Sequence, residues 1–202
     1  MSMRKRDKDI IEALDTFRCL SRDQIAEIFF SNTKNATNNA NVSLKRLRDR
    51  GYIDANIERQ PFVYFPKPTK IKKDGNKVDH FLSIADVYID LKKIEMPTQF
   101  IVEPRYIEAD VRPDIFTIFK ETPFWIEVQN SVYSHKIMQK KINLYRDYFL
   151  SGEYAQLDWQ PEGEAYFPYI LIITDITYKI EVEDIQVFQY RSIKDFIQSI
   201  AA

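Results

Sequence analysis

The sequence predicts a two-module chain of mixed α and β structure, with a helical first module that ends in a hairpin and an α/β sandwich as the second module. Three apolar stripes at helical spacing fill the first fifty residues, and from His80 the pattern changes to helices alternating with strands. The charge also changes sign: residues 1–77 hold 17 Lys and Arg against 10 Asp and Glu, whereas residues 78–202 hold 12 against 20. This asymmetry is typical of a basic module that docks on a polyanion, although chance segregation of solvated charges remains an alternative.

The composition bounds the class of protein. With 202 residues, 45% of them hydrophobic and only 4 of them Gly, the chain can bury a sizeable core, and fibrous or disordered classes are excluded. The single cysteine, Cys19, cannot form an internal disulfide and is predicted to be a small core residue. No apolar stretch is long enough for a membrane span or a signal peptide, so we expect a cytoplasmic protein without a membrane partner.

Three short helices are predicted in the first module. Ile10, Leu14 and Phe17 share one face of the first helix, over residues 7–17. Ser21 and Gln24 form a potential capping box at the start of the second, which runs to about residue 30. The third is expected over residues 36–50, with Ala40, Leu44 and Leu47 on its apolar stripe and Gly51 as its left-handed stop.

A hairpin is predicted after Gly51. Residues 52–54 and 62–65 are β-prone, and the segment between them is polar with a turn-forming Pro61. Three helices with tight connections followed by a hairpin are the order of a winged helix-turn-helix. The string LKRLRDRGYI, residues 44–53, resembles the end of the recognition helix and the entry to the wing in that superfamily.

The polar face of the third helix carries the candidate DNA-binding residues. Asn38, Asn41, Lys45 and Arg48 project from one side of the helix. Asparagine is a weak helix former, but its amide can bond adenine edges, while Lys and Arg can contact guanine and phosphates. The alternative is an ordinary solvated face that begins with a polar capping cluster.

Further basic residues extend the predicted DNA-binding set beyond the helix. Arg59 lies between the two strands of the hairpin, and a basic, turn-rich connector follows it. The connector lysines are suited either to phosphate contacts or to a solvated linker. We therefore predict a DNA-binding domain over residues 1–66, a linker over 67–79 and a second domain over 80–202, with Lys70, Lys72 and Lys73 as linker contacts.

The second module is predicted to be an α/β sandwich around a mixed sheet. The order is a helix, an extended segment, a hairpin, a long helix, a continuous apolar strand, a further strand and a last helix that Ser192 caps. The apolar run YILIIT suits a central strand that is covered on both faces. The predicted ranges are 80–93, 100–102, 113–119 with 124–129, 134–150, 169–174 and 185–190.

The hairpin of this module carries two acidic residues. Asp114 opens its first strand and Glu127 lies inside the second, with twelve residues between them. A hairpin of that length can bring both carboxylates to one sheet face, where they could share a Mg²⁺ ion with the Val128 carbonyl. Such a metal would activate water for attack on a phosphodiester. The alternative makes Asp114 a turn residue and Glu127 a solvent-facing strand residue, but the apolar neighbours of Glu127 weaken it.

Pro113-Asp114 followed by Glu127-Val128-Gln129 and a helix resembles the core of the PD-(D/E)XK nuclease superfamily. The resemblance implies that Asp114 and Glu127 are catalytic metal ligands and that Gln129 stands where a lysine normally activates the water. Glutamine can orient a water but cannot stabilise hydroxide by charge, so the substitution leaves activity open. Glu103, Glu108 and Asp86 are alternative candidates for a third acidic ligand.

Residues 8 to about 175 resemble the replication-relaxation family of plasmids, phages and conjugative elements. The resemblance rests on a winged helix followed by HFLSIADVYIDL, an RPD strand, a WIEVQ strand and a helix that ends in YRDYF. It implies a DNA-binding accessory factor in replication or relaxase-dependent DNA processing, with a relaxase or replication protein as a partner. An active Mg²⁺-dependent endonuclease is the first alternative, and a winged helix used for protein contacts or transcriptional regulation is the second. Homodimerisation is expected from how often winged helices bind paired half-sites.

Overall fold

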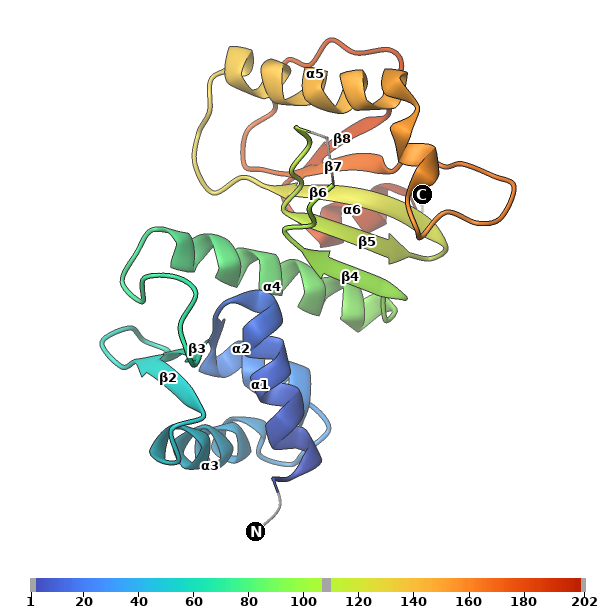
Figure 1. The fold of residues 1–202 in the computed structure, drawn as a ribbon. Helices are drawn as coiled ribbons and strands as arrows, with labels where there is room; N and C mark the ends of the chain where they lie inside the picture. The colour runs from blue at the N-terminus through green and yellow to red at the C-terminus, as the bar shows by residue number, and fades with distance from the viewer. Residues whose placement is uncertain (1–2, 107–109, 201–202) are drawn as a thin grey trace. The chain divides into compact units, whose positions relative to one another are not determined.

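The computed structural model describes residues 3–106 and 110–200 and shows an α+β fold. Within these residues it has six α-helices, a three-stranded sheet and a mixed five-stranded sheet (Figure 1). The chain divides into two compact units, Met1–Ile89 and Asp90–Ala202, called here the first and second unit. In the described part of the chain, no helix is long and apolar enough to cross a membrane.

The helices of the first unit follow the predicted apolar stripes. They are α1 (Lys5–Phe17), α2 (Arg22–Phe30) and α3 (Ala36–Asp49). The capping box of α2 is present, because the Ser21 hydroxyl accepts from the Gln24 N–H at 3.2 Å and the Gln24 side chain accepts from the Ser21 N–H at 3.0 Å. Gly51 ends α3 with a φ of +73°, a conformation that a residue with a Cβ rarely adopts.

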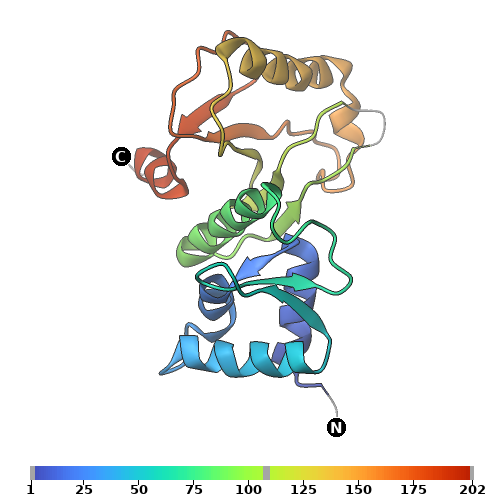
Figure 2. The ribbon, with the colours of Figure 1, turned by 90° about the vertical axis from the view of Figure 1, so that its left-hand side faces the viewer.

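The sheet of the first unit contains one strand that the sequence did not reveal. β1 (Leu20–Ser21) pairs antiparallel with β3 (Val63–Pro66), which also pairs with β2 (Ile53–Asn56), so the strand order is β1-β3-β2. In Figures 1 and 2, the β2–β3 hairpin follows the C-terminal end of α3. Cys19 is fully buried beside β1, as predicted, and burial raises the pKa of its thiol to about 12.

The helix α4 (Lys77–Ile94) begins three residues before its predicted start at His80. Its first part contacts α1 and α2 of the first unit: the Gln24 amide donates to the Leu82 carbonyl at 2.8 Å, and the rings of Phe17 and Tyr88 lie 5.3 Å apart. The division between the units therefore falls within α4, at Ile89, rather than in the predicted linker at 67–79. The expected domain start at residue 80 lies inside the first unit.

The second unit has a five-stranded mixed sheet in the order β4-β5-β6-β7-β8. The first three strands form an antiparallel meander, and β6, β7 and β8 run parallel. Its elements are β4 (Gln99–Val102), β5 (Ile115–Phe119), β6 (Thr122–Val128), α5 (His135–Ser151), a 3-10 turn η1 (Glu153–Gln156), β7 (Tyr169–Ile173), β8 (Val187–Tyr190) and α6 (Ile193–Ile200). Apart from η1, these elements match the predicted order.

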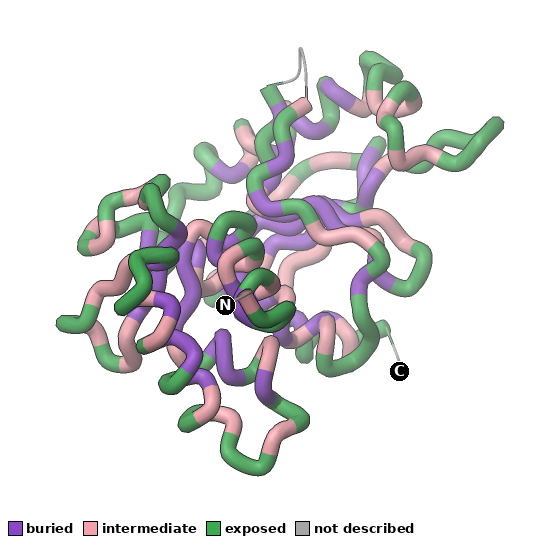
Figure 3. Tube along the Cα trace, turned by 60° about the horizontal axis from the view of Figure 1, so that its bottom comes forward, coloured by how far each residue is buried: buried purple, intermediate pink, exposed green. Residues whose placement is uncertain are grey.

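Two helices cover opposite faces of this sheet. Phe124 and Trp125 are neighbours in β6, so their side chains point to opposite faces. The Trp125 ring contacts Tyr145 of α5 at 5.4 Å, and the Phe124 ring contacts Phe196 of α6 at 5.6 Å. Figure 3 colours the chain by burial, and the residues Ile170, Leu171 and Ile172 of β7 are at most 1% exposed. The predicted double coverage of this strand is confirmed.

The β5–β6 hairpin closes through a two-residue turn. Phe119 pairs with Thr122, and both turn residues, Lys120 and Glu121, have positive φ values of 48° and 61°. A type I′ geometry of this kind requires positive φ at both positions and favours Asn-Gly. The turn is shorter than the expected four-residue segment, and it fixes the register that sets Asp114 opposite Glu127.

We expect Glu121→Gly to stabilise the protein by about 1 kcal/mol, because glycine adopts this conformation without the steric cost that a Cβ imposes. Urea unfolding measures the difference. Glu121→Ala is the matched control: it removes the same carboxylate but keeps the Cβ. Equal gains from both variants would attribute the effect to charge and contradict the backbone explanation.

Candidate nucleic-acid interface and carboxylate cluster

The asparagines at the start of α3 have different surroundings. Asn35 is the N-cap, and its side chain accepts from the Asn38 N–H at 3.3 Å. The amide of Asn39 donates to the Thr33 hydroxyl at 3.1 Å. Asn38 and Asn41 are exposed. Capping thus accounts for Asn35 and a bond to Thr33 for Asn39, whereas the two candidate DNA-binding asparagines lie on the solvent side of the helix.

A pocket of about 320 Å³ lies on the exposed side of α3, and we call it the α3 pocket. Three of the four predicted residues of this helix line it, namely Asn41, Lys45 and Arg48, whereas Asn38 lies one turn before them. The remaining lining residues come from the start of α2 and from the hairpin: Arg22, Gln60, Phe62 and Tyr64. The α3 pocket therefore gathers cationic, amide and aromatic groups from three segments of the first unit.

Two guanidinium groups flank Tyr64 at the α3 pocket. Burial raises the pKa of the Tyr64 phenol above its ordinary value, and the nearby positive charges of Arg48 and Arg22 oppose that rise. Arg22 also pairs with Asp23 at 2.8 Å, which is an exposed and therefore weak ion pair. Among the residues that the structure describes, Lys45 has no ion-pair partner, so its ammonium group is available to an external anion.

A buried ion pair fixes α3 to α1. One guanidinium nitrogen of Arg46 contacts both carboxylate oxygens of Asp7, at 2.6 and 2.9 Å, and the side chain of Asp7 is only 5% exposed. Because Arg46 faces inward, it is separated from Lys45 and Arg48 on the outer face. The pair holds the orientation of α3 and thereby of the α3 pocket.

The other predicted basic contacts lie outside the α3 pocket, and three of them have acidic partners in the first unit. Arg59 pairs with Asp79 at 2.6 Å, Lys70 with Asp15 at 2.7 Å, and Lys73 with Asp54 at 2.8 Å. The Lys73 contact lowers the pKa of Asp54. Exposed ion pairs of this kind contribute at most about 1 kcal/mol, so phosphates can compete for these cations. Lys72 is exposed.

The second unit brings the predicted carboxylates together. The antiparallel register, continued by one residue, sets Asp114 opposite Glu127. The Asp114 carboxylate accepts from the Val128 N–H at 2.8 Å. Asp114 is half-buried, whereas Glu127 is fully buried, so the solvent-facing alternative for Glu127 is wrong. Gln129 follows the end of β6, and its N–H donates to the Ile173 carbonyl at 2.9 Å.

Two residues of α5 contact Glu127, and neither was predicted. The Lys141 ammonium pairs with one oxygen of the Glu127 carboxylate, and the Tyr145 hydroxyl donates to the other. We call Asp114, Glu127, Lys141 and Tyr145 the carboxylate cluster. A signal for Lys141 was present in the sequence, because this lysine lies three residues after Met138 and four before Tyr145, on the buried side of α5.

The electrostatics of the carboxylate cluster follow from its burial. Burial raises the pKa of Glu127 to about 8, although the charge of Lys141 opposes the rise. For Lys141, burial lowers the pKa, but the charges of Glu127 and Asp114 outweigh it and the pKa lies above its ordinary value. Burial and the charge of Glu127 raise the pKa of Tyr145 well above its ordinary value. These groups can hold a proton between them and can respond to a nearby anion or cation.

The three candidates for a third acidic ligand lie in different parts of the chain. The backbone N–H of Glu103 donates to the Asp114 carbonyl at 2.8 Å, which places the backbone of Glu103 beside that of Asp114. Asp86 belongs to the first unit, where it accepts from the Gln24 amide at 2.7 Å. Glu108 lies outside the described residues. Within residues 3–106 and 110–200, no three His, Cys, Asp or Glu side chains form a group that could hold a metal ion.

Comparison of the chain with family models, with curated proteins and with solved structures finds no match.

Proposed function

We propose that this chain binds duplex DNA through α3, which lies in the major groove. The observation that carries the proposal is the α3 pocket, which Arg22, Lys45 and Arg48 line together with Asn41 on an exposed helix face. Cations of this kind contact phosphates and guanine, and an asparagine amide can pair with adenine. The order of helix, short strand, two helices and hairpin, with β1 paired to β3, supports the winged helix-turn-helix interpretation.

The wider role in the proposal is the one that the resemblance to the replication-relaxation family implies. The chain would act as a DNA-binding accessory factor of a mobile element, in replication or relaxase-dependent DNA processing. A relaxase or replication protein would be its partner in the cytoplasm, and a homodimer would match paired half-sites.

Binding of a labelled duplex, measured by fluorescence anisotropy at several salt concentrations, tests the proposal. If Arg22, Lys45 and Arg48 each neutralise one phosphate, log K should fall with log salt with a slope of about −3. Absence of binding at low salt would reject the proposal and favour the winged helix as a protein-interaction module.

The position of Val42 leads to a specific prediction, namely that the protein prefers thymine over uracil in the bound duplex. It is 57% exposed and lies beside Asn41, between Asn38 and Lys45 along the helix. An exposed valine here is suited to contact the 5-methyl group of thymine. Replacing thymine by uracil in an A·T-rich duplex should weaken binding about fourfold, the value of one buried methyl group.

The Val42→Ser variant should bind thymine and uracil duplexes equally. Val132→Ser is the matched control, because Val132 is 79% exposed in the second unit, and it should keep the fourfold difference. A thymine preference that survives Val42→Ser would assign the methyl contact to another residue.

A Mg²⁺-dependent endonuclease is the second candidate function, and the position of Lys141 favours it. Gln129 lacks the charge that the PD-(D/E)XK resemblance expects of this position, and the Lys141 ammonium lies at the Glu127 carboxylate instead. Asp114 and Glu127 supply the hard oxygen ligands that Mg²⁺ prefers, and a carboxylate oxygen can accept a second partner beside a hydrogen bond. The metal would activate a water for attack on a phosphodiester.

Incubation with supercoiled and branched DNA plus Mg²⁺ or Mn²⁺ tests the second candidate. Cleavage should occur with the wild-type protein and be lost in Asp114→Ala and Lys141→Met, while Lys140→Met, a change of the exposed neighbour, should cleave normally. Cleavage that survives Asp114→Ala would reject this assignment.

A further inference from the structure

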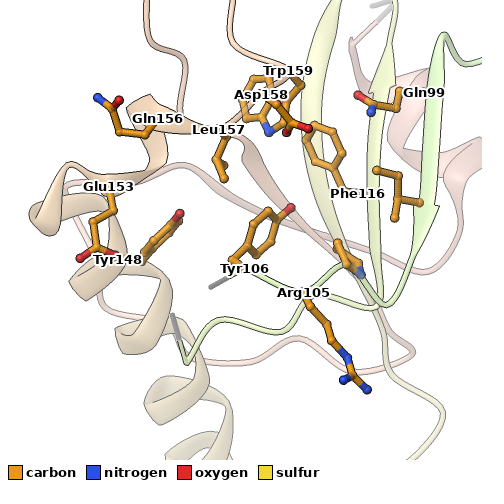
Figure 4. A pocket seen from close by; sticks show the side chains of 12 residues that line it. Gln99, Arg105, Tyr106, Phe116, Tyr148, Glu153, Gln156, Leu157, Asp158 and Trp159 are labelled. Atoms are coloured by element: carbon orange, nitrogen blue, oxygen red, sulfur yellow. The ribbon is translucent and has the colours of Figure 1, made fainter. Parts of the chain in front are cut away.

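A cavity of about 710 Å³ opens in the second unit, on the face of the sheet that α5 covers. Its lining comes from β4 and the segment that follows it, from β5, from α5, and from η1 with the three residues after it. Cavities of this size hold small organic ligands. Figure 4 shows the lining side chains, among them Arg105, Tyr106, Phe116, Tyr148, Asp158 and Trp159.

Four aromatic rings, those of Tyr106, Phe116, Tyr148 and Trp159, line the cavity. Tyr106 and Tyr148 lie 6.2 Å apart with their planes at 30°, and Phe116 and Trp159 lie 5.0 Å apart at 37°. The Trp125 indole N–H donates to the Tyr106 hydroxyl at 2.6 Å and holds this ring in place. A planar, fixed aromatic surface of this kind stacks on flat heteroaromatic ligands such as nucleobases.

The polar groups around the rings carry both signs of charge. Arg105 is exposed, and in Figure 4 its guanidinium lies at the edge of the cavity, away from Asp158 and Trp159. Asp158 and Glu153 supply carboxylate acceptors, and Gln99 and Gln156 supply amides. The indole N–H of Trp159 is buried and has no hydrogen-bond partner among the described residues, so the wall also holds an unsatisfied donor.

From these groups we infer that the cavity binds a nucleoside 5′-monophosphate unit, with its base among the rings and its phosphate at Arg105. A nucleotide fits because it combines a flat base that carries N–H donors with an anionic end. The guanidinium pairs with the phosphate, and the carboxylates accept from the amino groups of the base. The unit is either a free nucleotide or one nucleotide of an unpaired strand, and this site is separate from duplex binding by α3.

Asp158 determines a base preference. A carboxylate that accepts hydrogen bonds favours guanine, which presents two adjacent N–H donors, over thymine, which presents one. The cavity should therefore bind dGMP about tenfold more tightly than dTMP. Asp158→Asn should remove most of this difference, because an amide can also donate to the thymine carbonyls.

Isothermal titration calorimetry of the full chain with dGMP and dTMP tests the inference, and tryptophan fluorescence locates the ligand. The chain has two tryptophans, and Trp125 is fully buried, so quenching by a stacked base should report on Trp159 and disappear in Trp159→Phe. Tyr106→Leu and Arg105→Ala should each weaken dGMP binding about tenfold or more. Arg191→Ala, a change at an exposed arginine outside the cavity, should leave it unchanged.

A comparison of dGMP with a single-stranded oligonucleotide distinguishes the two sources of the nucleotide. If a single-stranded oligonucleotide of about 10 nucleotides binds more tightly than dGMP and loses affinity in Arg105→Ala, the ligand is an unpaired strand. If dGMP binds and the oligonucleotide does not displace it, the ligand is a free nucleotide. No saturable heat with dGMP or the oligonucleotide at about 1 mM, or equal binding by Arg105→Ala and the wild type, would overturn the inference. Duplex binding should stay unchanged in Arg105→Ala, which separates this test from that of α3.

Discussion

Replacing Lys45 and Arg48 together with Ala is expected to weaken duplex binding about 100-fold at moderate salt. Both side chains line the α3 pocket, and neither is held by a buried partner, so each is available to the DNA. A base or phosphate contact from Lys or Arg is worth roughly 1–3 kcal/mol. The salt slope should become less steep by about 2, because two fewer counterions are released. Anisotropy titrations at several salt concentrations measure both quantities.

The matched control removes two positive charges elsewhere. Lys179 and Lys194 are exposed in the second unit, and their double Ala variant has the same net charge as the Lys45/Arg48 variant. It should bind duplex DNA like the wild type. If both double variants lose affinity equally, the effect comes from net charge, and the assignment of α3 as the reading helix is contradicted.

Lys141→Met should destabilise the protein in a pH-dependent way, by about 3 kcal/mol at pH 9 and by little at pH 5. The pKa of Glu127 is raised by burial to about 8, so the folded protein keeps this carboxyl protonated at low pH, where it needs no cation. The stability that this raised pKa contributes is fully present below the pKa of Glu127 in the unfolded chain. It is lost as the pH rises through the pKa of Glu127 in the folded protein. Above that value the ionised Glu127 depends on Lys141, which the variant lacks. Urea unfolding at both pH values measures the difference.

A double variant tests whether the unpaired charge of Glu127 causes this loss of stability. Adding Glu127→Gln to Lys141→Met removes the buried charge and should restore most of the stability at pH 9, because breaking an ion pair costs more than replacing both partners. Lys140→Met, at an exposed position of the same helix, should have no pH-dependent effect. An equal loss from Lys141→Met at pH 5 and pH 9 would show that the lysine acts through its packing and not through its charge.

Most helices and strands of this protein could be predicted because their apolar periodicity and caps are local. Ser21 with Gln24 and Gly51 act within a few residues of the chain, and the structure confirms both. The two-residue strand β1 could not be predicted, because Leu20 and Ser21 pair with a segment more than forty residues away. The tight turn at Lys120 and Glu121 was missed because these residues are poor matches to its positive φ values.

The residues of the candidate sites likewise divide into those that local sequence predicts and those that only the folded chain brings together. The alternation of side chains along the hairpin was sufficient to predict that Asp114 and Glu127 share one face of the sheet. Their direct pairing was not predictable, because the two-residue turn sets a different register from the expected four-residue one. Lys141 could not be assigned to Glu127 from the sequence, because a helix can place any of several residues over a given strand. The partners of Arg59, Lys70 and Lys73 depended on the folded path of the chain, which brings distant acidic residues beside them.

The helix α4 determines how this protein can be dissected. Val78, Phe81 and Ile84 of α4 are at most 1% exposed, and they lie before Ile89, in the part of α4 that belongs to the first unit. A fragment that ends at residue 66 would lose these side chains and leave an apolar surface open to water, which favours aggregation. Expression of the first unit for crystallography or NMR therefore needs an end point after Ile94, where the helix is complete.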